Sequence, residues 1–576
     1  MSTQTACPDV SITMPVFNDA EWVATALRSC LNQSLGSIEV IVVDDASTDE
    51  TASIVEEFVA TDARVRLLRQ GTNQSAFQAR RAGILASTAP YILFLDGDDE
   101  LVPHAAASAL TIARDESADV VAFGCQVVKP DGSTGGDYEA AMQPTVPELI
   151  GEDIIATLFP VGKTAQGQLW RYLFSRDLLA AAYKSLPSEL VLPRANDLPI
   201  AFLALMRARK YVSTPMVLYR YFFRRGASGH RLVSMDDYRF MSSAIDSIES
   251  IAQAVAIESE TRDEPSLLIA AYESARLSVT GRVLDYVWGI ADLQMRAECV
   301  KLLTERVGPV ALVAACADFC SKALPLLATA IEPPVLSERD VQHVVIRASN
   351  LGTGGAQGVV IAQAKHLAQA GFAVTIAVDS APDTHFRLPE DVQAVQVVGE
   401  SRGQKLTNFA AFCEENRVDV IIDHYVLYND RWPYFAISAA AGGIPTIGWL
   451  HNFALRPIVD GSTRLSFLEQ YLPLLATIVV LSEADVAYWK LRGLSRVVYL
   501  PNPASPLLEH LPPRSSPRTS PRDVLEIVWW GRLQQATKQV REFVEIGSTL
   551  RDLDIDFRLT IIGPDGPDLT AAQLHE

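Results

Sequence analysis

The sequence predicts an α/β protein with two parallel sheets separated by a helical segment. Between residues 9 and 230, and again between 341 and 510, short apolar runs alternate with amphipathic stretches, which is typical of alternating strands and helices. Residues 236–335 are rich in Ala, Leu, Ser and Glu and indicate helices. The domains that we expect are 9–235, 236–338 and 339–510, then a linker over 511–522 and a last strand–helix–strand unit over 523–576.

Composition excludes several classes of protein. The chain has 576 residues, too many for one ordinary domain, and its net charge of −20 disfavours a nucleic-acid-coating surface. We find no spanning helix and no secretory signal. The seven scattered cysteines form no CxxC pair, so we expect neither disulfides nor a zinc site. These features favour a cytoplasmic protein, and peripheral association with the inner face of the cell membrane stays open.

The first acidic cluster follows a buried strand. After a short strand over 10–14, the apolar run 38–43 predicts a parallel strand covered on both faces, and it ends at Asp44 and Asp45. Ligands of open α/β sheets bind beyond the carboxyl ends of strands, so these carboxylates could contact a ribose or a base. The alternative is that they only cap the next helix.

A second acidic cluster follows the strand over 91–95. The segment Asp96-Gly-Asp-Asp-Glu100 places four carboxylates in five residues, and these repel one another unless a cation lies among them. Mg²⁺ or Mn²⁺, bound by carboxylates and substrate phosphates, is the usual solution, and it would neutralise a diphosphate leaving group. The alternative is a solvated acidic turn, but a second acidic strand end upstream favours a binding site.

These motifs, in this order, resemble the family 2 glycosyltransferases with the GT-A fold, a Rossmann-like nucleotide-sugar-binding domain. The resemblance covers about 9–230 and is carried by Pro15-Val-Phe-Asn18, Val43-Asp-Asp-Ala-Ser-Thr-Asp49, Ala79-Arg80, Leu95-Asp-Gly-Asp-Asp99, Asn196-Asp197 and Tyr219-Arg-Tyr221.

The resemblance implies a role for each matching residue. The nucleotide sugar would be bound by Pro15, Asp44, Asp45, Arg80 and Asp96, and the metal by Asp98 and Asp99. Asp197 matches the general base, although Asn196 replaces the Glu of the family's acidic pair. In an inverting transfer, one such carboxylate accepts the proton of the acceptor hydroxyl.

The second half begins with a strand over 344–347 and a glycine turn that includes Gly354 and Gly355. A glycine turn, a helix and an acid at the next strand end could form an NAD-binding fingerprint, but Gln357 occupies the third glycine position. The NAD-dependent interpretation is therefore the weaker alternative for this segment.

Later motifs of the second half resemble the family 4 glycosyltransferases of the GT-B, double-Rossmann type. They are the stretch that ends in His451-Asn452, Val498-Tyr-Leu-Pro-Asn-Pro503, and Gly531-Arg-Leu533 with Lys538. The resemblance implies that Arg532 and Lys538 clamp the donor diphosphate. It also implies that Gly354, Gly355 and His451 lie on the acceptor side, and that this module needs no metal.

The family's donor domain continues beyond the length present here, so we expect an incomplete GT-B module with an exposed apolar edge and face. We expect the whole chain to transfer sugar from a nucleotide-diphosphate donor to a glycan or lipid-linked acceptor in surface-polysaccharide or cell-wall biosynthesis. The alternatives are a binding or scaffold protein with a degenerate second module, and an NAD-dependent sugar-modifying enzyme. The helical segment shows no chemistry-bearing motif, and we expect it to bridge the two α/β parts.

Overall fold

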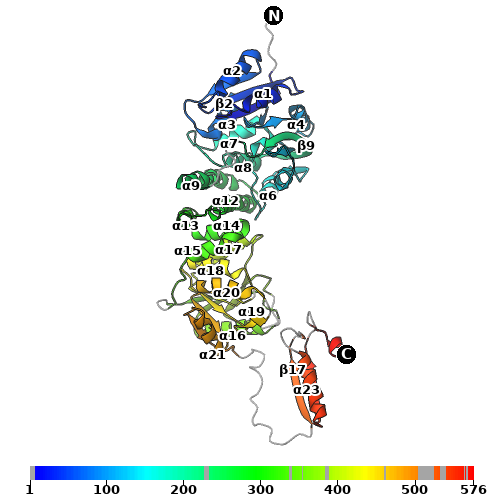
Figure 1. The fold of residues 1–576 in the computed structure, drawn as a ribbon, viewed down its shortest axis with the longest axis vertical. Coiled ribbons are helices and arrows are strands. Elements are labelled where there is room, and N and C mark those ends of the chain that lie inside the picture. The colour runs from blue at the N-terminus through cyan, green and yellow to red at the C-terminus, as the bar shows by residue number, and fades with distance from the viewer. Residues whose placement is uncertain are drawn as a thin grey trace. The chain divides into compact units, whose positions relative to one another are not determined.

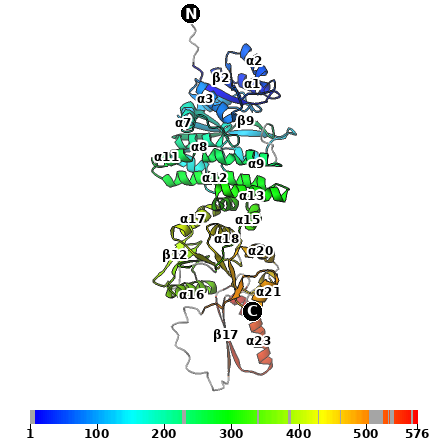
Figure 2. The same ribbon diagram turned by 90° about the vertical axis from the view of Figure 1, so that its left-hand side faces the viewer.

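The computed structural model divides the chain into two compact units, Met1–Pro506 and Leu507–Glu576. Figures 1 and 2 show their elements from two directions. None of the described helices is both long and apolar enough to span a membrane. The structure describes residues 7–225, 232–336, 340–352, 354–382, 388–427, 429–459, 462–503, 524–531, 533, 540–563, 565 and 569–575.

The first unit begins with a mixed sheet of nine strands in the order β3-β2-β1-β4-β8-β6-β9-β5, with β7 paired to β9. The strands are β1 (Val10–Val16), β2 (Ile38–Asp44), β3 (Val65–Arg69), β4 (Tyr91–Phe94), β5 (Glu100–Leu101), β6 (Val120–Val128), β7 (Glu148–Ile150), β8 (Tyr172–Ser175) and β9 (Lys210–Phe222). Strands β3, β2, β1 and β4 are parallel, so their carboxyl ends meet at one edge. Every residue of β1 and β2 is buried, as the unbroken apolar run of β2 predicts.

Helices surround this sheet. They are α1 (Val23–Leu31), α2 (Thr51–Thr61), α3 (Ser75–Ala86), α4 (Ala105–Asp115), α5 (Asp137–Met142), α6 (Asp153–Leu158), η1 (Leu169–Arg171), α7 (Arg176–Lys184) and α8 (Leu198–Arg207). Helix α3 lies so close to β1 that a Cβ on Gly83 would be 2.2 Å from Thr13 Cγ2. Only glycine permits this approach, which brings the side chains of α3 to the sheet.

The predicted helical segment is present between the two sheets in the sequence. It contains α9 (Met235–Ser242), α10 (Ala244–Glu249), α11 (Ala252–Ser259), α12 (Pro265–Trp288), α13 (Leu293–Val307), α14 (Pro309–Phe319), η3 (Ser321–Ala323) and α15 (Leu324–Ala330). Helix α12 packs against α6 of the first sheet region and against α14. The buried side chains of the segment belong to one apolar cluster that also includes residues of both sheets.

The second sheet is fully parallel, with seven strands in the order β12-β11-β10-β13-β14-β15-β16. Its elements are β10 (His343–Ala348), α16 (Gly355–Gln369), β11 (Ala373–Val378), β12 (Val392–Gln396), α17 (Arg402–Glu415), β13 (Val420–Asp423), α18 (Trp432–Ala441), β14 (Thr446–Trp449), α19 (Arg456–Val459), α20 (Arg464–Tyr471), η4 (Leu472–Leu474), β15 (Thr477–Val480), α21 (Glu483–Leu491) and β16 (Val497–Tyr499). Asp318 at the end of α14 accepts hydrogen bonds from Ser401 Oγ (2.6 Å) and Gly403 N (2.8 Å) at the start of α17. The helical segment therefore contacts both α/β regions.

The second unit holds the predicted strand–helix–strand arrangement. Its described elements are β17 (Leu525–Trp530), α23 (Val540–Asp552), β18 (Phe557–Ile562) and α24 (Ala571–His575), with β17 and β18 parallel. Apolar side chains are exposed on this small sheet, as expected: Val528 is 51%, Trp530 76% and Ile562 55% exposed. The predicted linker over 511–522 lies outside the described residues, and the finer domain boundaries stay predictions.

Candidate active site

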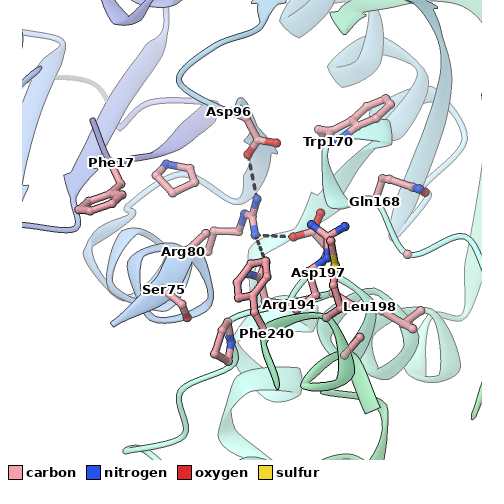
Figure 3. Close-up of a pocket in the computed structure, with 18 of the residues that line it drawn as sticks. Phe17, Ser75, Arg80, Asp96, Gln168, Trp170, Arg194, Asp197, Leu198 and Phe240 are labelled. Atoms are coloured by element: carbon pink, nitrogen blue, oxygen red, sulfur yellow. Dashed lines mark hydrogen bonds and ion pairs between the residues drawn. The ribbon is translucent and has the colours of Figure 1, made fainter. Parts of the chain in front are cut away.

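A cavity of about 590 Å³ opens where the carboxyl ends of β1, β2 and β4 meet. Pro15, Phe17, Asp45, Asp96 and Asp98 line it from this edge of the sheet, and Figure 3 labels two of them, Phe17 and Asp96. The cavity's other lining comes from the loop before α8, from η1 and from helices of the helical segment. Four of the predicted site positions, Pro15, Asp45, Asp96 and Asp98, are thus brought to one space by the parallel pairing of the strands.

Arg80 on α3 lies at the centre of this site. Its Nη1 donates to Asn196 Oδ1 (2.8 Å) and to Asp197 Oδ1, and its Nη2 donates to Asp96 Oδ1 (2.8 Å; Figure 3). Arg80 is only 4% exposed, and charged hydrogen bonds are strong in such surroundings. One guanidinium therefore joins the acid after β4 to the acid before α8.

Asp197 immediately precedes α8 and faces the cavity. Burial raises the pKa of the Asp197 carboxyl to about 6, against the opposing effect of the positive charge of Arg80. Its side chain still exposes 22% of its surface. A partly accessible carboxylate that ionises near neutral pH suits a general base.

Asp98 lies among other carboxylates. Burial raises the pKa of Asp98 to about 7, and the charges of Asp96 and Asp19 contribute further. Burial also raises the pKa of Asp19 to about 6. A Cβ on Gly97 would be 2.6 Å from Asp19 Oδ2, so glycine at this position lets the carboxylates approach.

Such oxygen ligands fit a hard divalent cation. Within the described residues, no group of three or more His, Cys, Asp or Glu side chains could hold a metal ion. A metal at Asp98 would therefore need further ligands from a bound phosphate, which is the way Mg²⁺ is commonly held.

The structure corrects the prediction that Asp99 holds the metal. Asp99 is 1% exposed and does not line the cavity. Its Oδ2 accepts from Tyr219 Oη (2.8 Å) and its Oδ1 from Phe222 N (2.7 Å). Because both oxygens are used to hold β9, Asp99 has a structural role.

The two acids at the end of β2, Asp44 and Asp45, also differ in whether they line the cavity. Asp44 is 4% exposed, does not line the cavity, and accepts from Ser47 N at 3.1 Å in the turn before α2. This corrects its assignment to the nucleotide site. Asp45 lines the cavity, and its Oδ1 accepts from Gln74 N at 2.7 Å. Asp44 thus stabilises the turn, whereas Asp45 borders the cavity, and its contact with a nucleotide stays a prediction.

Several aromatic residues that line the cavity were not among the predicted site residues. Phe17, directly after β1, is 44% exposed. Trp170 stacks on Tyr221 with ring centroids 5.5 Å apart, and Tyr221 packs on Tyr138 at 5.6 Å. These rings come from β1, η1, β9 and α5, so no spacing in the sequence could have grouped them.

The helical segment also lines the cavity. Phe240 of α9 and Arg282 and Tyr286 of α12 all face it. This corrects the expectation that the segment carries no chemistry. The polar residues of α12 could not be distinguished from other surface residues, because only packing against the first sheet region places them at the site.

The second-half candidates gather around α16. Gly354 and Gly355 begin this helix, and Gln363 on it contacts His424 Nε2 at 2.9 Å. His424 Nδ1 lies 2.7 Å from His451 Nε2. Burial lowers the pKa of His451 to about 4, so the pair is neutral. The predicted donor residues Arg532 and Lys538 lie outside the described residues.

Comparison with known families also distinguishes the first α/β region from the second. Residues 11–173 match the model of Glycosyl transferase family 2, and residues 353–506 match that of Glycosyltransferase Family 4. One part of the chain is therefore similar to family 2 and another to family 4, and the class of enzyme indicated is a glycosyltransferase. The second match favours the transferase interpretation of the glycine turn over the NAD-dependent one.

Individual relatives come from several bacteria. The chain is 32% identical over 215 residues to "Putative glycosyltransferase EpsH" of Bacillus subtilis, which is 37% of this chain and 61% of that protein. It is 32% identical over 142 residues to "Succinoglycan biosynthesis protein ExoO" of Rhizobium meliloti (25% and 40%). It is 28% identical over 153 residues to the "GalNAc(5)-diNAcBac-PP-undecaprenol beta-1,3-glucosyltransferase" of Campylobacter jejuni (26% and 49%). The chain thus spans about three fifths or less of the length of these relatives.

Among solved structures, S. aureus TarS 1–349 in complex with UDP-GlcNAc is similar. It has a TM-score of 0.35 and 19% sequence identity, and the match covers 55% of this chain and 90% of that chain.

Proposed function

We propose that the first α/β region transfers a sugar from a nucleotide-diphosphate donor to a glycan or lipid-linked acceptor in surface-polysaccharide or cell-wall biosynthesis. The observation that carries this proposal is the link from Asp96 through Arg80 to Asp197, in a cavity that also contains Asp98. Relatives named for succinoglycan biosynthesis and for transfer to an undecaprenol-linked glycan support the acceptor class.

The donor would lie along the carboxyl ends of β1, β2 and β4, where ligands of such sheets bind. Asp45 would contact the nucleoside, and the exposed ring of Phe17 offers a face on which a base can stack. Arg80 lies between Asp96, at this edge, and Asp197, and donates to both (Figure 3).

A Mg²⁺ or Mn²⁺ ion would be held by Asp98, with Asp96 and Asp19 nearby. When bound, it would neutralise the charge that develops on the diphosphate leaving group. Burial first, and then the charges of Asp96 and Asp19, raise the pKa of Asp98, while the charge of Arg225 has the opposite effect. A bound divalent cation would further offset the repulsion among these carboxylates.

Asp197 would act as the general base. Its carboxylate accepts the proton of the acceptor hydroxyl while the acceptor oxygen forms a bond to the anomeric carbon. The bond from that carbon to the phosphate oxygen breaks on the opposite face, and its electron pair leaves with the nucleoside diphosphate. The configuration is therefore inverted. Arg80 orients Asp197 throughout through its hydrogen bond to Oδ1.

The proposal is tested with labelled UDP- and GDP-sugars, in EDTA and after addition of Mn²⁺ or Mg²⁺. We expect metal-dependent turnover that falls about a hundredfold or more in Asp98→Ala and Asp197→Asn variants. Asp177→Asn is the matched control, since this α7 side chain is 91% exposed. Unchanged turnover in the two site variants would contradict the assignment.

For the second region, we propose the acceptor half of a retaining, metal-independent transferase. The observation that favours this role is the neutral His424–His451 pair that Gln363 joins to the glycine-turn helix. A scaffold role for this region predicts that His451→Ala leaves every transfer product of the full chain unchanged, which product analysis can measure.

A further inference from the structure

One face of α12 forms a wall of the active-site cavity. Ser278, Arg282 and Tyr286 are spaced by four residues, so they share a face of the helix, and all three line the cavity. Ser278 Oγ accepts from Ala165 N (3.0 Å), in the loop before η1. This hydrogen bond attaches the face of α12 to the first α/β region.

Arg282 offers a guanidinium without a counter-ion. Its side chain is exposed, and no ion pair or hydrogen bond joins it to another residue in the part of the chain that the structure describes. Its neighbour Arg276, on the same helix, is bound by Glu273 at 2.9 Å. The chain has 69 acidic and 49 basic residues, so most arginines have carboxylates available to pair with. A cavity-lining arginine that forms no ion pair with a carboxylate is therefore unusual.

Arg194 provides a second cation on the same wall. Its Nη2 donates to Tyr286 Oη at 3.5 Å, and its guanidinium lies 5.7 Å from the centre of the Phe240 ring. Among the described residues, no carboxylate forms an ion pair with it. Tyr286 is one helical turn from Arg282, so both arginines border the same part of the cavity.

Four of the five carboxylates that line the cavity lie at the strand ends with Arg225, which donates to Asp98 O at 3.3 Å, and the fifth is Asp197. Asp19, Asp45, Asp96 and Asp98 follow the strand ends, whereas Arg194 and Phe240 lie on the other side of Arg80 from Asp96 (Figure 3). Arg194 also precedes Asp197 by only three residues, in the loop that α10 anchors through the hydrogen bond from Ser247 Oγ to Arg194 O. A hydroxyl that reaches Asp197 therefore belongs to a molecule that extends along the arginine side.

We infer that Arg194, Arg282 and Tyr286 form an acceptor subsite for an anionic group, a phosphate or a carboxylate, next to the hydroxyl that receives the sugar. This inference rests on the proposed function, because it takes Asp197 as the base that the acceptor contacts. Guanidinium groups bind both anions through paired hydrogen bonds, and aromatic neighbours keep their planes ordered. The arginines also offset the repulsion that the five cavity carboxylates would exert on an anionic acceptor.

The experiment compares acceptors that differ only in charge. Each neutral alkyl glycoside is paired with its sugar phosphate and with its uronic acid, and a prenyl-diphosphate-linked sugar forms a further arm that distinguishes a lipid source from a glycan source. The proteins are wild type, Arg194→Gln, Arg282→Gln, Arg282→Lys and the control Arg276→Gln. Measurements are the KM for acceptor, the KM for donor, hydrolysis of donor without acceptor, and calorimetric binding of each acceptor alone.

We expect the wild type to favour the anionic acceptor by about tenfold in KM, and added salt to remove the preference. Arg194→Gln and Arg282→Gln should raise that KM about tenfold, while donor hydrolysis and the KM for neutral acceptor change less than twofold. Arg282→Lys should retain part of the preference, and Arg276→Gln all of it.

Two results would overturn the inference. The first is equal use of neutral and anionic acceptors by the wild type. The second is a loss of donor hydrolysis in the glutamine variants as large as their loss of transfer, which would assign the arginines to the donor diphosphate. Wild type that neither hydrolyses nor transfers any donor would contradict the proposed function instead. In that case calorimetry still decides whether Arg282 binds the anionic molecule. Thermal unfolding identifies any variant that fails to fold, and Arg282→Lys then carries the test.

Discussion

Arg80 and Asp197 are separated by 117 residues, yet the guanidinium of Arg80 donates directly to Asp197 Oδ1. The same guanidinium donates to Asp96 Oδ1 at 2.8 Å. Because Arg80 is almost fully buried, its positive charge is balanced by these two acids and not by solvent. The base and the donor side of the cavity are therefore held in one arrangement by a single side chain.

The first prediction concerns this link. Arg80→Gln should lower transfer by about a hundredfold or more, because Asp197 and Asp96 lose their common partner and the two acids are left buried. It should also lower the thermal stability, which calorimetry measures. Arg81→Gln is the matched control on the same helix, since Arg81 is half-buried, does not line the cavity, and donates to Pro187 O at 2.8 Å. Normal activity in Arg80→Gln would show that the link is dispensable.

The second prediction concerns pH. Burial raises the pKa of Asp197 to about 6, and the base must be ionised to accept a proton. Transfer should therefore be full above pH 7 and fall about tenfold per pH unit below about 6. Because the charge of Arg80 lowers the pKa of Asp197, residual activity of Arg80→Gln should decline at higher pH than that of the wild type. Profiles of kcat/KM against pH, measured at saturating Mn²⁺ for the wild type and for Arg80→Gln, show where each activity declines. A flat wild-type profile down to pH 4.5 would exclude Asp197 as the base.

The third prediction separates Asp98 from Asp99. Asp99→Ala removes the acceptor of Tyr219 Oη and Phe222 N, so it should lower the free energy of unfolding by about 1–3 kcal/mol. The folded-state pKa of Asp98 is raised by burial, so its ionised form destabilises the fold above the unfolded pKa. Asp98→Asn should then leave stability at pH 8 unchanged or higher while it abolishes the response to Mn²⁺. Denaturant titrations measure the change in stability, and metal titrations measure the response to Mn²⁺. Loss of the Mn²⁺ response in Asp99→Ala with loss of stability in Asp98→Asn would show that Asp99 is the metal ligand and Asp98 the structural residue.

The fourth prediction concerns the glycine between the acids. In Gly97→Ala, the new Cβ would lie 2.6 Å from Asp19 Oδ2 and 2.9 Å from Val16 Cγ1, so the turn must shift. Donor KM should rise at least about tenfold with little loss of folding, since the residue borders the cavity. Gly71→Ala, which has nothing within 4 Å, is the control. A donor KM equal to wild type would show that the turn is tolerant.

Part of the site could be predicted because it depends on local sequence alone. An unbroken apolar run predicts a doubly covered strand, and acids directly after such strands must lie at the shared carboxyl edge of a parallel sheet. This reasoning located Asp45, Asp96 and Asp98 correctly in one cavity. It could not separate Asp45 from Asp44 or Asp98 from Asp99, because neighbouring residues in a turn face opposite sides and only the backbone geometry decides which one borders the cavity.

By itself, the sequence determined the succession of sheet, helical segment and sheet, and the acidic character of the first site, since both follow from periodicity along the chain. Only the tertiary structure decided that Arg80 joins two of those acids, and that α12 supplies Arg282 to the same cavity. The physical reason is that side chains far apart in the sequence meet only through packing. The close approach of α3 to the sheet at Gly83 and the contact of α12 with the first region bring these cations to the acids.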